Sequence, residues 1–372
     1  MNIFNPFFKD KNLQALKSYK YQAIDKSILG KYFYQDYVVS PALKYLIPKW
    51  MAPNVITIIG GIFVVLALLS TYCQDIFGRY THLLVGIFMY LYVLFDTLDG
   101  KQARRTGSGS PLGELMDHGV DVIVMGLLSI FLSREFGLNQ LETSCFFFIT
   151  YFMFYLPHWV QHQTGWMIFG PESNPIELVH FYLLIEIIRT VFGITSEVAR
   201  ETKVFGFIPF SMLLIGFFST ILCLQIVSSI KEVKDELEKT GKVWIGAINE
   251  MFPFTIQAIV VLSMNYIPIE NCIINQLRLL GGVLFMGMFV QWYIATRLLN
   301  MPCPKLYINF YITVGIAIGM NVCYFLGLSY IVDYIAIGYF IHSFLWESLL
   351  VYNIITKFSH FLGIHPFKIV EK

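Results

Sequence analysis

The segment that decides the fold is Asp96–Asp121, which reads DTLDGKQARRTGSGSPLGELMDHGVD. It places four aspartates, Asp96, Asp99, Asp117 and Asp121, in an otherwise apolar chain. Burying an acid without a partner costs several kcal/mol. Four acids together therefore require a positive partner, and a divalent metal ion is the simplest one. Acidic residues in membrane segments mark functional sites by default.

The spacing of these residues predicts two helices that face each other. Residues three, four, seven and eight positions apart share one face of a helix. Asp96, Asp99, Gly100 and Ala103 form one such set, and Gly113, Asp117 and Asp121 form another. The run 106–111, TGSGSP, lies between them and breaks helices. We therefore expect a helical hairpin whose acidic faces meet, with small residues that let a ligand approach the backbone.

The composition around this hairpin is that of a polytopic membrane protein. The chain is 56% hydrophobic and 14% charged, with a mean hydropathy of +0.62, whereas a soluble chain carries about a quarter charged residues. A bilayer span needs about 20 apolar residues. An all-α polytopic membrane bundle of about ten transmembrane helices is predicted, at 54–73, 79–98, 115–133, 144–164, 176–193, 204–229, 253–270, 277–297, 308–329 and 332–356. Polar Asn265 interrupts the seventh span.

The first fifty residues form a separate polar segment. They hold eight lysines against three aspartates, which predicts the cytoplasmic side. Leu13, Leu16 and Tyr19 beside lysines favour a short amphipathic helix at the membrane interface, although a solvated tail also fits. Ten spans then place both termini and the acidic hairpin on the cytoplasmic face. Three regions are expected: an N-terminal segment (1–50), a catalytic transmembrane core (51–200) and C-terminal transmembrane helices (201–372).

The acidic hairpin also resembles a known family. The spacing D-x2-D-G-x2-A-R-x8-G-x3-D-x3-D is the signature of the CDP-alcohol phosphotransferases, and every fixed position is present here. Lys17–Tyr21, Asp25–Ser27, Ala52–Thr57, the His118 that follows the third Asp, and His158-Trp159 with Thr164-Gly165 are similar to the eukaryotic choline and ethanolamine phosphotransferases. Roughly the first half of the chain carries this resemblance.

The resemblance implies a reaction and its partners. A CDP-alcohol, CDP-choline or CDP-ethanolamine, would donate its phosphoalcohol group to diacylglycerol, giving phosphatidylcholine or phosphatidylethanolamine and CMP. It implies an endoplasmic reticulum or Golgi membrane and a homodimer. One or two Mg²⁺ or Mn²⁺ ions would be held by Asp96, Asp99, Asp117 and Asp121, since hard cations prefer carboxylate oxygens and leave sites for phosphate. With a net charge of +1 and no basic stripe, nothing indicates nucleic acid.

The attacking hydroxyl must lose a proton, and His118 is the expected general base because a neutral imidazole accepts protons near pH 7. Glu114, one turn earlier, is expected to orient its ring. A structural hydrogen-bonding role for His118 is the alternative. His158 is the second choice as base, and with His162 it has the spacing of a metal pair. His180 and Glu177 fit either a lipid-access cavity or plain helix packing.

Substrate-binding residues are expected around the hairpin: Asn54, Gly100, Ala103, Arg104 and Gly113. Arg104 either contacts a phosphate of the nucleotide or is one of the basic residues that flank a membrane span on the cytoplasmic side. For Arg105 the flanking role is preferred, and Lys101 is intermediate between the two roles. Asn54 caps its helix or, as the family implies, lies near the nucleotide.

Three other functions remain to be weighed. The protein could belong to another branch of the same family, with an inositol, glycerol-phosphate or sphingolipid product. A non-catalytic membrane subunit is disfavoured by the intact acids, and a transporter by their place at one membrane face rather than the midplane. The sequence leaves open the choice between choline and ethanolamine, the metal, the acyl preference and the assembly.

Overall fold

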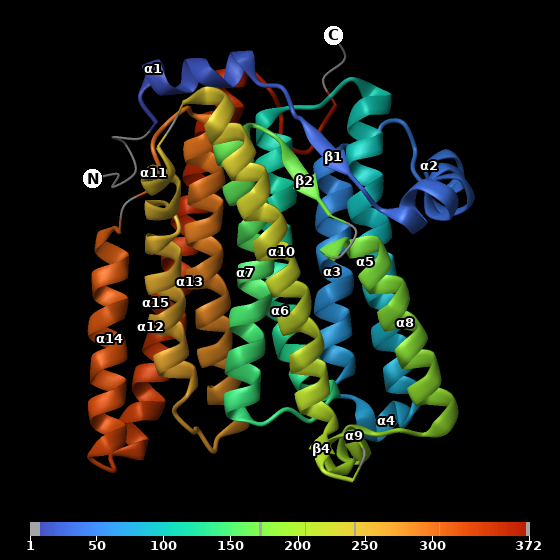
Figure 1. Ribbon diagram of the computed structural model, residues 1–372, viewed down its shortest axis with the longest axis vertical. Helices are drawn as coiled ribbons and strands as arrows, with labels where there is room; N and C mark the ends of the chain where they lie inside the picture. The colour runs from blue at the N-terminus through green and yellow to red at the C-terminus, as the bar shows by residue number, and fades with distance from the viewer. Residues whose placement is uncertain (1–7, 171–172, 205, 242, 305, 370–372) are drawn as a thin grey trace.

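A computed structural model describes residues 8–170, 173–204, 206–241, 243–304 and 306–369, and there the protein is a bundle of long helices (Figure 1). A helix lies at each predicted span, which confirms the all-α class. These helices are α3 (Pro53–Ser70), α5 (Tyr80–Thr106), α6 (Pro111–Glu135), α7 (Gln140–Thr164), α8 (Pro175–Phe192), α10 (Phe210–Thr240), α12 (Phe252–Asn265), α13 (Cys272–Leu298), α14 (Ile308–Phe325) and α15 (Ser329–Leu362).

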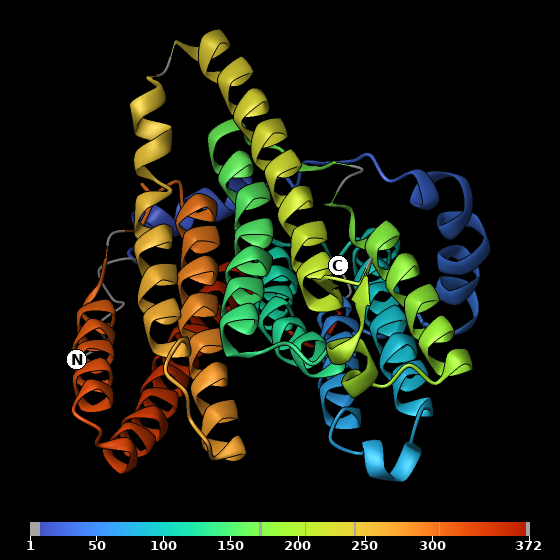
Figure 2. The ribbon, with the colours of Figure 1, turned by 60° about the horizontal axis from the view of Figure 1, so that its bottom comes forward.

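Eight helical segments of the described chain are long and apolar enough to cross a membrane, with α11 and α12 counted as one. The other two of the ten, α7 and α8, have the length but carry buried polar side chains, among them His158 and Gln161 on α7 and Glu186 and Arg189 on α8. Both helices nevertheless run alongside the others, α7 against α6 and α10 and α8 against α5 (Figures 1 and 2). These polar groups are buried within the protein rather than exposed on its surface.

Shorter elements cap the two ends of the bundle. They are α1 (Asp10–Leu13), η1 (Gln14–Ser18), β1 (Ala23–Asp25), η2 (Gly30–Val39), α2 (Ser40–Tyr45), α4 (Gln74–Phe77), β2 (Met167–Phe169), α9 (Ser196–Glu201), β3 (Lys203–Val204), β4 (Ile208–Pro209) and α11 (Trp244–Asn249). Parallel β1 and β2 form one two-stranded sheet, with Ile24 opposite Ile168, and antiparallel β3 and β4 form the other. The two described chain ends lie at the same end of the bundle (Figure 1).

The N-terminal segment is anchored at this end, as an interfacial segment would be. Leu13 and Leu16 are buried in the main core. In contrast, Tyr32, Tyr37 and Trp50 are largely exposed on η2 and in the turn after α2. Aromatic side chains of this kind suit a membrane–water interface. Residues 1–7 of the predicted segment lie outside the described residues.

The predicted hairpin is confirmed as α5 and α6. Helix α5 is capped by Gly107, whose φ of 64° is the left-handed conformation that glycine adopts without strain. Helix α6 begins after Ser110, whose hydroxyl accepts a hydrogen bond from the Gly113 amide at 3.0 Å, and Pro111 occupies its first turn. Local stop and start signals therefore bring the two acidic faces together.

Helix α6 lies between two hydrophobic cores. On one side it packs against α3, in the core that also contains α5, and on the other against α7 and α13. Gly126 permits the second contact, because a Cβ at this position would lie 2.5 Å from both Tyr151 Oη and Val283 Cγ2. Close approach at small residues is typical of membrane helices, and it fixes the position of α6 in the bundle.

Candidate active site

A cavity of about 1430 Å³ opens beside the hairpin, near the end of the bundle that carries the N-terminal segment and the C-terminal tail. Residues of β1, α3, α5, α6, α7 and α8 line it, together with the tail from Leu362 to Ile369. Further from the acids it is lined by apolar residues of α6, α7, α8 and α10, such as Leu128, Met153, Val179 and Phe218. The cavity thus joins a polar chamber to an apolar one.

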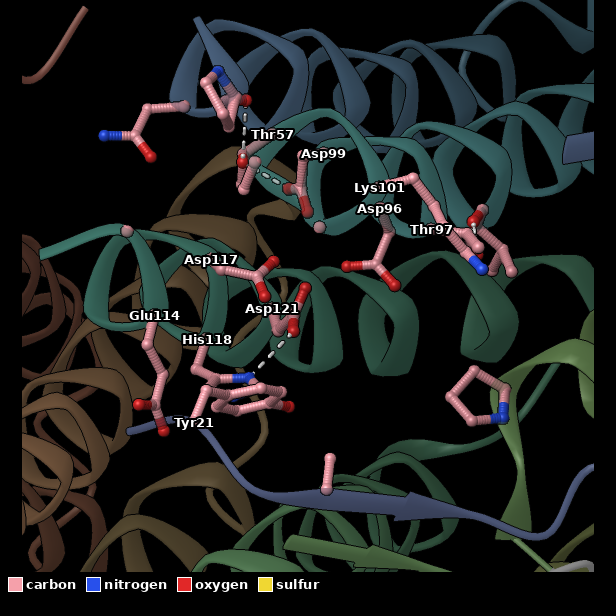
Figure 3. A pocket seen from close by; sticks show the side chains of 18 of the residues that line it. Tyr21, Thr57, Asp96, Thr97, Asp99, Lys101, Glu114, Asp117, His118 and Asp121 are labelled. Carbon is pink, nitrogen blue, oxygen red and sulfur yellow. Dashed lines mark hydrogen bonds and ion pairs between the residues drawn. The ribbon is translucent and has the colours of Figure 1, made fainter. Parts of the chain in front are cut away.

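The four predicted metal ligands converge in the polar chamber (Figure 3). Oxygens of Asp96, Asp99 and Asp117 lie within 4.8 Å of one another, and so do ligand atoms of Asp117, His118 and Asp121. Asp117 belongs to both groups, so the acids form one continuous cluster. Such a cluster is unfavourable without a positive partner.

Neighbouring hydroxyls hold two of these carboxylates in place. Thr57 on α3 donates to Asp99 Oδ2. Tyr92, one turn before Asp96 on α5, donates to Asp121 Oδ1 at 2.7 Å. Asp117 Oδ1, by contrast, is buried without a hydrogen-bond partner. An orphaned carboxylate oxygen among three further acids fits a hard divalent cation, because oxygen donors are what such ions take.

His118 lies on the wall of the same chamber. Its Nδ1 faces Asp121 Oδ2 at 3.4 Å (Figure 3), and its Nε2 is buried without a partner. With the proton on Nδ1 directed at the carboxylate, the Nε2 lone pair is free to accept a proton. The His158 ring packs edge-on against His118, with centroids 4.9 Å apart.

The expected pairing of Glu114 with His118 is wrong. Glu114 Oε1 accepts hydrogen bonds from Arg297 on α13 and from Gln161 on α7, at 3.1 Å for the latter. The full charge of Arg297 outcompetes a neutral imidazole for this carboxylate. Burial, together with Glu114, raises the pKa of the nearby Tyr19 phenol, so Tyr19 stays protonated at neutral pH. Within the described chain, Asp121 rather than Glu114 is the carboxylate beside the His118 ring.

All five predicted substrate-binding residues line the cavity: Asn54, Gly100, Ala103, Arg104 and Gly113. Asn54 is not the cap of α3, since that position is Ala52. Instead, its amide donates to the Pro366 carbonyl of the C-terminal tail at 2.8 Å.

The neighbouring basic residues occupy different environments. Arg104 is exposed at the rim of the cavity. Arg105 donates to the carbonyls of Leu43 and Ile47, so it anchors α2 instead. Lys101 also lines the cavity.

The other three histidines that the sequence singled out, His158, His162 and His180, have structural partners. His158 Nδ1 lies 2.8 Å from the Phe154 carbonyl, whereas His162 pairs with Glu250 at 2.9 Å, so these two do not converge as a metal pair. His180 binds the Ile176 carbonyl at 2.6 Å. Glu177 accepts from the Ser27 hydroxyl at 2.9 Å and thereby ties the N-terminal segment to α8.

Sequence reasoning missed four contributors. Tyr92 precedes Asp96 by four residues, so its place on the acidic face was available from the spacing. Arg297 is an ionisable residue in a predicted span, which is itself a signal of function. Gln161 and the C-terminal tail carried no local signal, because only the tertiary fold brings them to the site.

The chain is similar to known proteins over much of its length. Residues 50–248 match the family model of the CDP-alcohol phosphatidyltransferases. An uncharacterised class-I protein of that family from Schizosaccharomyces pombe is 32% identical over 68% of this chain and 69% of its own length. Choline/ethanolaminephosphotransferase 1 of Arabidopsis thaliana is 26% identical over 96% of this chain and 97% of its own. The Saccharomyces cerevisiae protein of the same name is 33% identical over 54% and 51%.

Proposed function

Since the chain belongs to the CDP-alcohol phosphatidyltransferase family, we propose that it transfers phosphocholine or phosphoethanolamine from a CDP-alcohol to diacylglycerol and releases CMP. The observation that carries this proposal is the convergence of Asp96, Asp99, Asp117 and Asp121 beside His118, in a cavity with a polar and an apolar chamber. A water-soluble nucleotide suits the first chamber and a diacylglycerol suits the second.

The carboxylates of Asp96, Asp99, Asp117 and Asp121 would hold one or two divalent ions, Mg²⁺ or Mn²⁺. When bound, such an ion neutralises pyrophosphate charge and stabilises the CMP leaving group. Thr57 and Tyr92 keep two of the carboxylates oriented by donating to them. Arg104, at the rim, is placed to pair with a phosphate oxygen of the nucleotide.

The proton is handled by His118. Its Nε2 accepts the proton of the diacylglycerol hydroxyl as that oxygen attacks the phosphorus bearing the head group. One oxygen–phosphorus bond forms while the bond from that phosphorus to the CMP oxygen breaks. Asp121, beside Nδ1, stabilises the imidazolium that results. His158 supplies the edge-on wall that keeps the ring in this position.

We extend the proposal to the membrane. The acidic chamber and both termini would face the cytoplasm, in an endoplasmic reticulum or Golgi membrane, and residues 51–200 would form the catalytic core of a homodimer. The last two turns of α5 carry Lys101, Arg104 and Arg105, which favours the cytoplasmic side under the positive-inside rule. An exposed position there also gives a soluble nucleotide access to the cavity.

The test is an assay on membranes that contain the full chain. Diacylglycerol, Mg²⁺ or Mn²⁺, and labelled CDP-choline or CDP-ethanolamine are supplied in parallel, with Asp117→Ala membranes as the blank. We expect metal-dependent phospholipid and CMP, absent from the blank, and the ratio of products ranks the two head groups. Folded wild-type protein that makes no product from either donor would contradict the proposal and favour another CDP-alcohol.

His118→Ala tests the base in the same membranes. This variant should retain metal and nucleotide binding but lose turnover, because only the proton acceptor is removed. Near-normal turnover would show that another group, such as His158, takes the proton.

A further inference from the structure

A second cavity lies at the opposite end of the bundle from the acidic chamber. It has a volume of about 220 Å³ and is enclosed by the end of α6, the start of α7, α9, the end of α12 and the start of α13. These elements meet at the lower end of the bundle in Figure 1, whereas the N-terminal segment and β1 lie at the upper end. None of its lining residues belongs to the active-site cavity.

The lining of this second cavity is strongly basic. It includes Arg134, Arg200 and Arg278 but no aspartate or glutamate. Within the described chain, none of the three arginines forms an ion pair. The Arg134 guanidinium donates to Thr71 and stacks on the Tyr72 ring, and neither of these residues lines the cavity. Arg200 and Arg278 are therefore the two cations left to a ligand, and no acidic residue of the lining balances them.

Arg278 is the most deeply placed of the three, with 1% of its surface exposed. Its guanidinium donates only to neutral acceptors, the carbonyls of Met264 and Ile267 and the Asn275 side chain, and its Nε has no partner. A buried cation without a counter-charge is costly. An anion in the cavity would supply the missing charge.

An independent observation points to the same ligand. Asn265 lines the cavity with 1% of its surface exposed, and neither its amide nitrogen nor its amide oxygen has a hydrogen-bond partner. Buried polar atoms are nearly always paired. The amide nitrogen of Asn265 is a donor that an anionic oxygen would satisfy.

Local packing sets the position of the α9 backbone at Arg200. Helix α9 rests on Gly137, where a Cβ would lie 3.0 Å from Arg200 Cβ and 2.9 Å from the Ser196 carbonyl. This close contact keeps the exposed Arg200 in the lining of the cavity, which the buried Arg278 also lines. The cavity lining thus contains one buried and one exposed arginine.

From these features we propose that the second cavity binds a phosphate group, carried by a membrane phospholipid or present as inorganic phosphate. Guanidinium groups match phosphate oxygens in geometry as well as charge. The volume equals that of about seven liquid water molecules, which is room for a phosphate and several waters. The site is separate from the proposed transfer chemistry.

The experiment measures the thermal stability of the full-length protein in uncharged detergent. Sodium phosphate is titrated against sodium chloride at equal ionic strength, and phosphatidylglycerol is titrated against diacylglycerol, which lacks phosphate. The variants are Arg200→Gln and Asn265→Leu. Arg79→Gln is the matched control, because Arg79 is an exposed arginine that does not line the cavity.

We expect a saturable rise in melting temperature for the wild type and Arg79→Gln. Loss of one charge-assisted contact should raise the half-saturating concentration about tenfold in Arg200→Gln. Asn265→Leu should lose the response yet remain folded, since the change removes an unsatisfied buried amide. A response to the phosphate salt identifies a free anion, and a response to phosphatidylglycerol alone identifies a lipid head group.

Phospholipid that copurifies with the protein is read by native mass spectrometry before any addition. A phospholipid retained by the wild type and by Arg79→Gln but absent from Arg200→Gln supports the lipid source. The proposal is overturned if the wild type neither responds to a titrant nor retains phospholipid, or if both cavity variants respond as the wild type does.

Discussion

The ion pair between Glu114 and Arg297 joins residues 183 positions apart and links the catalytic hairpin to α13. The two partners differ in solvent access, because the Glu114 side chain is 2% exposed and that of Arg297 is 17% exposed. This difference predicts unequal costs when either partner is removed. Arg297→Gln leaves a buried carboxylate, whereas Glu114→Gln leaves a guanidinium that water can reach.

The magnitudes follow from that asymmetry. Removing one partner of a buried pair costs about 3–5 kcal/mol, and Arg297→Gln should fall near the lower limit because Gln161 still donates to Glu114. Glu114→Gln should cost about 1.5 kcal/mol, the scale of a lost hydrogen bond to a charged group. The double variant should cost about 2.5 kcal/mol, which corresponds to a coupling of about 2 kcal/mol between the two residues.

A double-mutant cycle measures this coupling. Unfolding of the four proteins is followed by circular dichroism as dodecyl sulfate is added to mixed micelles, and free energies are compared at one detergent composition. If the free-energy costs of the two single variants simply add up in the double variant, the ion pair does not determine the position of Glu114.

The same Glu114→Gln variant separates the two roles considered for this residue. If Glu114 oriented the His118 ring, its amide form would change the shape of the pH profile of turnover. Because Asp121 is the carboxylate at His118 Nδ1, we expect a lower rate with an unchanged profile. A profile displaced in Glu114→Gln would restore the orienting role.

Three further predictions concern packing, a thiol and the metal. Gly126→Ala should destabilise the protein by about 1–3 kcal/mol, since its Cβ would lie 2.5 Å from Tyr151 Oη; Gly315→Ala, where a Cβ meets nothing within 4 Å, is the control in thermal unfolding. Burial, and then Glu250, raises the pKa of Cys303 to about 12. The thiolate fraction of Cys303 should therefore be about one in ten thousand at pH 8 and rise tenfold per pH unit. The rate of iodoacetamide labelling measures this fraction in a variant whose only cysteine is Cys303. The same variant unfolded in dodecyl sulfate is the reference. Chelation by EDTA should abolish transfer and added Mg²⁺ or Mn²⁺ should restore it; full activity in excess chelator would contradict a carboxylate-held ion.

The sequence predicted those parts of the site that depend on local rules. Helical spacing brought Asp96 and Asp99 to one face, and the breaker run before Pro111 closed the hairpin, because both effects operate within a few turns. The pairing of Glu114 with His118 failed for the opposite reason. That prediction assumed that the partner of Glu114 is a residue near it in the sequence. In the structure the partner is Arg297 on α13.

The N-terminal segment illustrates the same limit. Its burial at Leu16 and its exposed aromatic residues match an amphipathic pattern. Its attachment, however, depends on Glu177, which holds the Ser27 hydroxyl across 150 positions. The sequence contained both residues but gave no indication that they meet.

The C-terminal helices, whose sequence resembles the family least, take part in the site through contacts with α6 and α3. Gln291 on α13 donates to the carbonyl of Gly119, the residue after His118, and to Glu347 on α15. Pro366 in the tail accepts from Asn54 at the other side of the cavity. Since α6 carries Asp117, His118 and Asp121, and Gln291 of α13 binds the carbonyl of Gly119 on the same helix, a shift of α13 displaces ligands and base together. Such contacts need only a donor, an acceptor and close packing, so the sequence of these helices can diverge while the position of the acidic face is preserved.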